Sequence, residues 1–274
     1  MKKVPNADCI PKVLIDNAKR IFSGSAQFRA LRDVWIKTRY LSSLFEVAGK
    51  VSLDLSRAAI LDIGCSKCDI LLAMQKLGSN NLTGLNLFAF DRQWLSSDLY
   101  YKQYFGDSAG KIKYVVCDVD KESFPFKDSS YEVVLLIHVL EHLHDPGRIL
   151  LECYRVLSPS GLIAIGVPNT ANLRNRIFAL FGRSIYYSLE EWLGNNQRII
   201  NGGFRRFIGH VREYTMEEID YMMRKYGFEV LIRRCYSSRI PQMSILHHLY
   251  TFFERLYPRF AYHMLIIGRK SIDE

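Results

Sequence analysis

The sequence predicts an α/β fold in which a mostly parallel sheet is covered by helices on both faces. Short apolar runs, typical of buried strands, recur along the chain, and helical patterns fit between most of them. Strands that alternate with helices favour a parallel sheet. The chain has 274 residues and is 49% hydrophobic, which is sufficient for a large core. The predicted strands are residues 59–63, 82–87, 112–117, 131–137 and 161–167.

Two helices between these strands have marked ends. Asp69 opens a helical stretch that Gly78 stops. Asp145 is the expected cap of a helix over about residues 146–157, and Pro146 suits its first position. The segment before Asp145 is therefore predicted to be a loop at the carboxyl end of the fourth strand.

A further helix and two strands are predicted near the end of the chain. Thr215 and Glu218 have the spacing of a capping box, and Gly227 ends the helix that they open. A strand at 228–233 follows. We expect the last apolar run, 262–268, to pair with it.

The pattern divides the chain into four parts. Residues 1–58 read as an N-terminal helical cap, and residues 59–168 form the strand and helix core. Residues 169–212 are rich in arginine, asparagine and aromatic side chains, and they read as an insertion after strand five. Residues 213–274 complete the core.

The positive charge of the chain is concentrated in this insertion. The net charge is +9, and residues 169–212 contribute +5 of it through seven arginines and two glutamates. Such a field favours an anionic partner, whether phosphate, carboxylate, lipid head group or nucleic acid. A solvated basic face explains the same charge, and this alternative stays open.

Composition also indicates a compartment. Polar residues interrupt the first twenty positions, so no secretory signal is expected there, and no apolar run reaches the roughly 18 residues of a membrane span. We therefore expect a cytoplasmic protein without a transmembrane segment. The six cysteines read as reduced thiols. Cys65 and Cys68 form a CxxC, but no second CxxC accompanies it, so we expect no metal there.

The stretch VVLLIHVLEHLHDP contains the spacing H-x-x-E-H at His138, Glu141 and His142, which is the zinc pattern of the inverted zinc proteases. That pattern requires a helix that places the two histidines on one face. Here His138 lies where a strand is expected to end. We therefore expect no zinc at this motif either.

Ligands of an open parallel sheet bind outside the carboxyl ends of its strands. The loop after the first strand has the sequence GCSKCD, which departs from the G-x-G-x-x-G of dinucleotide-binding proteins, and Asn86 replaces their acid. Both departures argue against a nicotinamide cofactor.

The set of strand ends resembles the class I S-adenosylmethionine-dependent methyltransferases. The matching segments are ILDIGCSKCDILLAMQKLG, LTGLNLFAFD, the run from CDVDKESFPF to IAIGVPN, and REYTMEEIDYMMRKYGFEVL. The chain resembles methyltransferases of the ubiquinone-biosynthesis type and glycan- or lipid-modifying relatives with a long insertion after strand five. The resemblance implies a Rossmann-like, doubly wound seven-stranded sheet with an antiparallel C-terminal strand.

The resemblance also implies a role for each strand end. Asp62, at the end of the first strand, and Gly64, Cys65 and Ser66, in the loop after it, would hold the methionine end of the cofactor. Asn86 and Leu87 would contact the ribose, and Asp118 and Val119 would contact the adenine. His138 would line the methyl-donor pocket. Ser66 and Cys68 replace the usual glycines, and they fit the turn if φ stays negative.

Glu141 and His142 would face the acceptor. We expect transfer to an oxygen, which must lose its proton, and imidazole is suited to accept it. His142 and His210, with Glu141, are the candidate catalytic residues. The insertion is a candidate lid whose acceptor-binding residues would be Asn169, Arg205, Arg206 and Arg212.

The aromatic residues among these arginines favour a small or lipid-linked anionic acceptor. An RNA methyltransferase and a non-catalytic homologue that binds S-adenosylmethionine remain as alternatives, and contact with a membrane surface stays open. The sequence does not indicate an oligomeric state.

Overall fold

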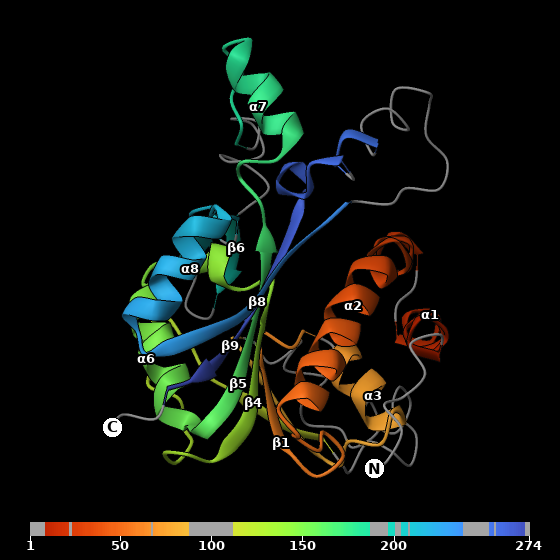
Figure 1. Cartoon of the computed structure of the whole chain (residues 1–274), viewed down its shortest axis with the longest axis vertical. Helices are drawn as coiled ribbons and strands as arrows, with labels where there is room; N and C mark the ends of the chain where they lie inside the picture. Colours follow the sequence, from red (N-terminus) through yellow and green to blue (C-terminus); the bar gives the residue numbers. More distant parts are fainter. Residues whose placement is uncertain are drawn as a thin grey trace.

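A seven-stranded sheet forms the centre of the computed structural model (Figure 1). The structure describes residues 9–21, 24–66, 68–87, 112–186, 197–200, 204–207, 209–237, 252–254 and 256–271. The strand order is β3-β2-β1-β4-β5-β9-β8, and β9 is antiparallel to both of its neighbours while the other pairs are parallel. The strands are β1 (Ala59–Ile63), β2 (Asn81–Asn86), β3 (Ile112–Val116), β4 (Tyr131–Ile137), β5 (Leu157–Pro168), β8 (Phe228–Tyr236) and β9 (His263–Lys270).

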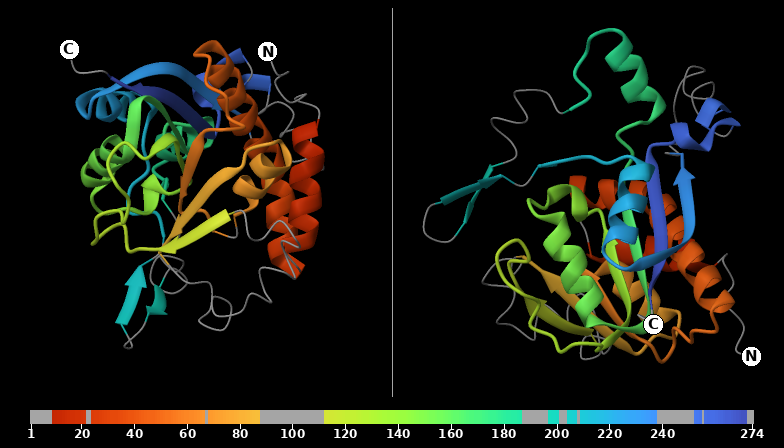
Figure 2. Two further views of the ribbon diagram at one scale, coloured as in Figure 1. Left: turned by 90° about the horizontal axis from the view of Figure 1, so that it is seen from below. Right: turned by 60° about the vertical axis from the view of Figure 1, so that its left-hand side comes forward.

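This arrangement confirms the predicted fold class. The sheet is doubly wound and mostly parallel, and its last strand in the sequence is the antiparallel one. Helices cover both faces (Figures 1 and 2). One face carries α1 (Cys9–Ile21), α2 (Gly24–Lys50) and α3 (Asp69–Lys76), and the other carries α6 (Pro146–Val156) and α8 (Met216–Lys225).

The core consists of two hydrophobic layers, one on each face of the sheet. Successive side chains of β4 point to opposite faces, so that Leu135 belongs to the layer under α2 and Leu136 to the layer under α6. Burial on both faces explains why the central strands are continuous apolar runs without alternation.

The N-terminal helices are built into the first layer. The hydroxyl of Tyr40 on α2 donates a hydrogen bond to the carbonyl of Met264 on β9, 3.1 Å away. Residues of α1, such as Ile10, are buried in the same hydrophobic cluster as β1 and β4. The segment predicted as a cap therefore lies along a face of the sheet. Its status as a separate unit, with the other domain boundaries, stays a prediction.

The predicted ends of the elements are mostly confirmed. The Asp145 side chain caps α6 by accepting from the backbone N–H of Arg148 at 3.0 Å. The capping box of α8 is present, with both of its hydrogen bonds between Thr215 and Glu218. The fifth strand was predicted to begin at residue 161, which is wrong, because it begins at Leu157 and pairs there with Tyr131.

Two short elements follow β5. Helix α7 (Leu173–Leu180) projects beyond the carboxyl edge of the sheet (Figure 1), and β6 (Gln197–Ile200) pairs with β7 (Phe204–Phe207) as an antiparallel hairpin. The side chains of residues 187–208 lie outside the described part of the structure.

The described residues also form two short turns of 3-10 helix, η2 (Leu140–His142) and η4 (Pro258–Phe260). Among the described helices, none combines the length and the apolar character needed to cross a bilayer.

Two adjacent leucines of α6 test the packing of the second layer. Leu150 is fully buried, whereas Leu151 is 55% exposed. We expect Leu150→Ala to lower the free energy of unfolding by about 2–5 kcal/mol, because it leaves a cavity in a close-packed core. Leu151→Ala should change it by less than about 0.5 kcal/mol. Urea denaturation of both variants measures the difference, and equal losses would contradict this packing.

Candidate functional site

The strand order reverses between β1 and β4, and the crevice at this point is where ligands of such sheets bind. The loop after β1 and the loop after β4 meet there. Gly64 has φ +71°, and a Cβ atom built on it would lie 2.3 Å from Cγ2 of Val139. Only glycine permits this approach of the two loops.

The loop after β1 has an unusual backbone conformation. Ser66 and Cys68 have φ +49° and +57°, so the condition of a negative φ, under which these residues would fit the turn without strain, is not met. Left-handed conformation costs an L-residue roughly 1–2 kcal/mol. Such strain is concentrated at ligand-binding loops, where the surrounding structure maintains it. Cys68 precedes the first turn of α3 and helps to direct the amino end of this helix toward the crevice.

The two cysteines of this loop are buried and in contact. Their Sγ atoms are 3.5 Å apart, and both are free thiols. The hydrogen bond from Cys68, followed by burial, raises the pKa of Cys65 far above its ordinary value. Cys65 is therefore a neutral packing group at neutral pH.

Two carboxyl groups lie beneath the loop. Asp62 on β1 is buried, and burial, followed by repulsion from Asp69, raises the pKa of Asp62 well above its ordinary value. Asp69 at the start of α3 forms an ion pair with Lys37 of α2. Lys37 was not predicted from the sequence, because it lies on a helix that only the tertiary fold brings to this loop.

The ends of β2 and β3 carry the residues expected to contact the ribose and the adenine. The Asn86 amide donates to the Tyr114 hydroxyl and accepts from the backbone N–H of Leu87, each at 3.0 Å. Asp118 accepts from the N–H of Asp120 at 3.2 Å, and Val119 next to it is buried. These side chains are held in place before any ligand is bound.

His138 marks the end of β4. Its φ is +56°, and its backbone N–H bonds to the carbonyl of Gly166 on β5 at 2.7 Å. Its Nδ1 atom lies 3.3 Å from Oε1 of Glu141. His138 therefore belongs to a strand end, and the helix required by the protease pattern is excluded.

The three candidate catalytic residues come together. One ligand-type atom each from Glu141, His142 and His210 lies within 4.8 Å of the other two. The rings of His142 and His210 stack edge to face with centroids 4.9 Å apart. Glu141 and His142 come from η2, whereas His210 comes from the chain that enters α8. The tertiary fold thus joins segments nearly 70 residues apart.

Both histidines are oriented through their Nδ1 atoms. Nδ1 of His142 lies 3.0 Å from the carbonyl of Gly209, and Nδ1 of His210 lies 2.8 Å from Oε1 of Glu213. The latter contact directs Nε2 of His210 toward Glu141, whose Oε1 atom is 4.0 Å away. Glu213 was not predicted from the sequence, where an isolated glutamate carries no signal.

Glu141 connects the two loops of the site. Its carbonyl accepts from the backbone N–H groups of Val211 and Arg212, at 2.7 and 3.3 Å. Its carboxyl group is 1% exposed. Burial by itself raises the pKa of Glu141, but the hydrogen bond and charge of His138 and the charge of His142 together bring it below its ordinary value. The site thus contains a buried carboxylate.

Two of the residues predicted to bind the acceptor have partners within the protein. Asn169 is buried, and its amide donates to the carbonyls of Arg259 and Ala261 at 2.9 and 2.8 Å, so it fastens β5 to the chain before β9. Arg212 pairs with Glu218 at 2.7 Å, which offsets its charge. The side chains of Arg205 and Arg206 lie outside the described part of the structure.

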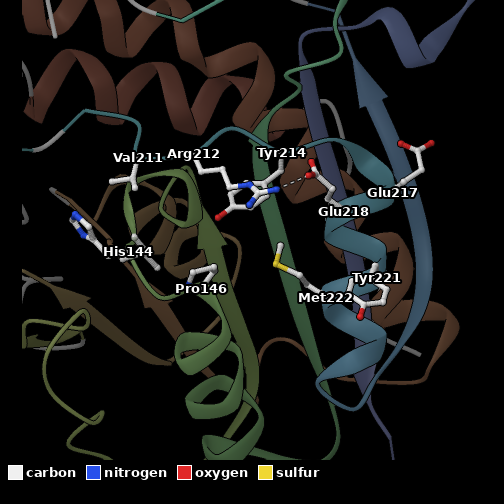
Figure 3. A pocket seen from close by; sticks show the side chains of 10 residues that line it. His144, Pro146, Val211, Arg212, Tyr214, Glu217, Glu218, Tyr221 and Met222 are labelled. Atoms are coloured by element: carbon white, nitrogen blue, oxygen red, sulfur yellow. Dashed lines mark hydrogen bonds and ion pairs between the residues drawn. The ribbon is translucent and has the colours of Figure 1, made fainter.

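A groove of about 720 Å³ lies beside the cluster, between the start of α6 and α8 (Figure 3). His144 and Pro146 line one side, Tyr214 and Met222 line the other, and the ion pair between Arg212 and Glu218 crosses its upper part. Its walls are mainly apolar. The groove is large enough for a small molecule that approaches the cluster from this side.

Comparison with known proteins agrees with this geometry. A family model described as a methyltransferase domain matches residues 61–165, which include β1, β4 and the cluster residues Glu141 and His142. A putative methyltransferase crystallised with the Haloferax volcanii Trm112 activator shares the fold, with a TM-score of 0.56, 16% identity, and coverage of 89% of this chain and 94% of that one. A putative methyltransferase from Bacillus halodurans has a TM-score of 0.52 and 16% identity, covering 84% and 100% of the two chains.

Residues 61–165 thus match a methyltransferase domain, and the chain is similar to S-adenosylmethionine-dependent methyltransferases. A demethylmenaquinone methyltransferase from Lactobacillus johnsonii is 31% identical over 155 residues, which are 57% of each chain. A ubiquinone biosynthesis O-methyltransferase from Pseudomonas aeruginosa is 24% identical, over 60% of this chain and 64% of its own. A probable S-adenosylmethionine-dependent methyltransferase of Mycobacterium tuberculosis is 41% identical but is matched over only 20% of its length, and the chain spans less than two thirds of each of these three relatives.

Several relatives of this chain are S-adenosylmethionine-dependent methyltransferases by name, and the crevice offers residues suited to that cofactor. The glycine turn and the amino end of α3 suit the polar methionine end, whereas Asn86 and Asp118 offer the oxygens that ribose hydroxyls and an adenine amino group require. The expected cofactor contacts at these positions stay predictions.

We expect Gly64→Ala to weaken binding of S-adenosylhomocysteine at least tenfold, because the new methyl group would collide with Val139 and push the two loops apart. Gly78→Ala is a matched control, since φ there is +108° but no atom lies within 4 Å of the added Cβ. It imposes strain without closing the crevice. Calorimetric titration of both variants makes the comparison, and equal affinities would place the cofactor elsewhere.

Proposed function

We propose that the protein transfers the methyl group of S-adenosylmethionine to an oxygen of a small or lipid-linked, anionic acceptor. The cluster of Glu141, His142 and His210 beside the family's cofactor crevice is the observation that supports this most. The cofactor supplies an activated methyl group, so the protein has mainly to align the acceptor and manage its proton.

The histidines are suited to that second task. A hydroxyl that attacks a methyl carbon loses its proton, and an imidazole titrates close to neutral pH. Nδ1 of His142 and Nδ1 of His210 are engaged with Gly209 and Glu213, so Nε2 is the atom of each ring that is directed to the acceptor. The carboxylate of Glu141 stabilises a positive charge on either ring.

The names of two relatives support a small acceptor. A ubiquinone biosynthesis O-methyltransferase and a 27-O-demethylrifamycin SV methyltransferase are both similar to this chain, the latter at 28% identity over 42% of it. Both names indicate transfer to oxygen. The apolar groove beside the cluster is consistent with an acceptor that has an apolar body.

A surface at the carboxyl edge supports a lipid-linked acceptor. Among the described residues, seven exposed large apolar side chains lie on α7 and on the chain before β9, namely Ile177, Leu180, Phe181, Phe252, Phe253, Leu256 and Tyr257. The two segments are in contact, because the Arg176 guanidinium lies 5.3 Å from the centre of the Phe260 ring. Arginines interleave with the apolar residues, as on surfaces that bind anionic lipid.

A screen with labelled cofactor tests the proposed function. Pools of lipid-linked molecules, small phosphorylated or carboxylated hydroxyl compounds, and RNA are offered separately to the full chain. We expect label in one of the first two pools, in a product whose methyl group survives as an ether or ester. Label in RNA alone would favour the RNA methyltransferase, and cofactor binding without label in any pool would favour the non-catalytic homologue.

The basic insertion generates a second test. Replacing Arg205 and Arg206 with alanine should raise the Michaelis constant for the acceptor at least fivefold, because a charged hydrogen bond to an anion contributes about 1.5–3 kcal/mol. The cofactor dissociation constant should stay within twofold. Arg57→Ala is the control, since Arg57 is exposed just before β1, at the opposite edge of the sheet. Unchanged kinetics in the double variant would exclude the insertion from acceptor binding.

The catalytic cluster gives a third test. His142→Asn keeps the size and polarity of the side chain but removes the imidazole, and we expect it to lower kcat by about 10²–10⁴ while the cofactor affinity is retained. The measurement is a single-turnover rate at saturating cofactor and acceptor. A variant that keeps the rate of the natural protein would remove His142 from the reaction.

A further inference from the structure

We propose that Glu141, His142 and His210 form a binding site for one divalent transition-metal cation. The inference deepens the proposed function and rests on it in one respect: the cation would bind the acceptor oxygen at the same cluster. The site itself follows from the arrangement of side chains and does not depend on the identity of the acceptor.

The donor set is the first argument. One carboxylate oxygen and two imidazole nitrogens lie within 4.8 Å of one another, at a point where two loops meet. Two histidines and one carboxylate suit zinc, iron, cobalt or manganese better than magnesium or calcium, which prefer oxygen. Three protein ligands also leave coordination positions for an oxygen of a substrate.

The orientation of the rings is the second argument. Histidines that bind a metal through one nitrogen almost always donate the N–H of the other to a carbonyl or carboxylate. His142 has the Gly209 carbonyl at its Nδ1 atom, 3.0 Å away, and His210 has Glu213 at 2.8 Å. Both rings are thus held in the tautomer that presents the Nε2 lone pair, which is the pattern of a metal site with its outer contacts in place.

The third argument is an unsatisfied carboxylate oxygen. Glu141 is buried, and its Oε1 atom lies 3.3 Å from His138. Its Oε2 atom is also buried and has no hydrogen-bond partner among the described residues. A buried polar atom without a partner is rare in folded proteins and costs about 1–3 kcal/mol, more when it is charged. A cation coordinated by this oxygen would remove that cost.

This site is different from the zinc motif in the sequence. His138 of the H-x-x-E-H spacing is not a member, because its Nδ1 atom contacts Glu141 and its ring packs edge to face on His263 with centroids 5.6 Å apart. The second histidine of the cluster is His210, which lies nearly 70 residues further along the chain than His142. The sequence predicts no bound zinc, from the CxxC and H-x-x-E-H motifs, and this proposal departs from that prediction because His210 belongs to neither motif.

A cation here would change how the acceptor loses its proton. A hydroxyl bound to a divalent cation is more acidic, so its proton leaves to water. The oxygen then forms the bond to the methyl carbon while the carbon–sulfur bond breaks, and the electron pair of that bond stays on sulfur. His142 and His210 would in this case act through the metal and would not accept the proton themselves.

Metal binding is tested directly on the full chain, without acceptor or cofactor. Protein freed of metal with a chelator is titrated with Zn²⁺ by calorimetry and with Co²⁺ by visible absorption. We expect one equivalent of each, with the cobalt spectrum of nitrogen and oxygen ligation. His142→Ala and His210→Ala should each weaken binding at least tenfold, and Glu213→Ala should weaken it about tenfold because it releases the His210 ring.

Two controls make the result specific. His144→Ala should bind both metals as the natural protein does, since His144 pairs with Asp120 outside the cluster. Glu141→Gln retains the shape of the side chain, so its loss of metal binding with an unchanged melting temperature excludes unfolding as the cause. Zinc binding that survives in the histidine variants and disappears in Cys65→Ser would overturn the inference, as would no binding at all.

The test of metal binding and the test of the proposed methyl transfer can fail independently of each other. Methyl transfer that continues in excess chelator, with no metal bound, would overturn the cation site and leave the histidines as bases. Stoichiometric metal binding that depends on His142 and His210 supports the site even if no acceptor pool is labelled, and in that case the proposed function fails alone.

Discussion

The buried carboxylate of Glu141 is the constraint on which the rest of the site depends. A charged group 1% exposed to solvent requires compensation from its neighbours, and here it comes from His138 and from the histidine pair. The backbone of the same residue fixes the chain that enters α8, through the N–H groups of Val211 and Arg212. One residue thus positions His210 relative to His142.

The strained backbone around the crevice serves the same arrangement. His138, Ser66 and Cys68 all adopt left-handed conformations at the carboxyl ends of β1 and β4. Two hydrophobic layers pack on the faces of the sheet and fix the position of these strands. The loops at the strand ends are therefore fixed as well. A rigid sheet can therefore maintain turns that would be unfavourable in isolation, and it presents a glycine turn, a helix end and a polar cluster to the same space.

The surfaces proposed to bind the acceptor are separate from this rigid part. The groove between α6 and α8 and the exposed apolar residues of α7 lie outside the two hydrophobic layers, where contacts can vary without disturbing the core. The ion pair between Arg212 and Glu218 shows that part of the basic charge is used within the protein itself. The remaining arginines are the ones to consider for an anionic ligand.

The sequence by itself determined the class of the fold, most element boundaries and the strand ends at which function is located. Apolar runs, helix caps such as Asp145 and the capping box of Thr215 act over a few residues, so they can be recognised locally. The start of β5 differs from the predicted residue 161 because Leu157 pairs with Tyr131 ahead of a register shift, after which Leu162 pairs with Val133.

Only the tertiary structure decided which polar residues act together. In the folded protein His210, and not His138, joins Glu141 and His142, and Glu213 contacts His210. Asn169 fastens two segments of the chain together, and Lys37 lies beside Asp69. The physical reason is that these contacts join segments far apart in the chain. Their partners are selected by the packing of loops against each other, for which spacing along the sequence carries no signal.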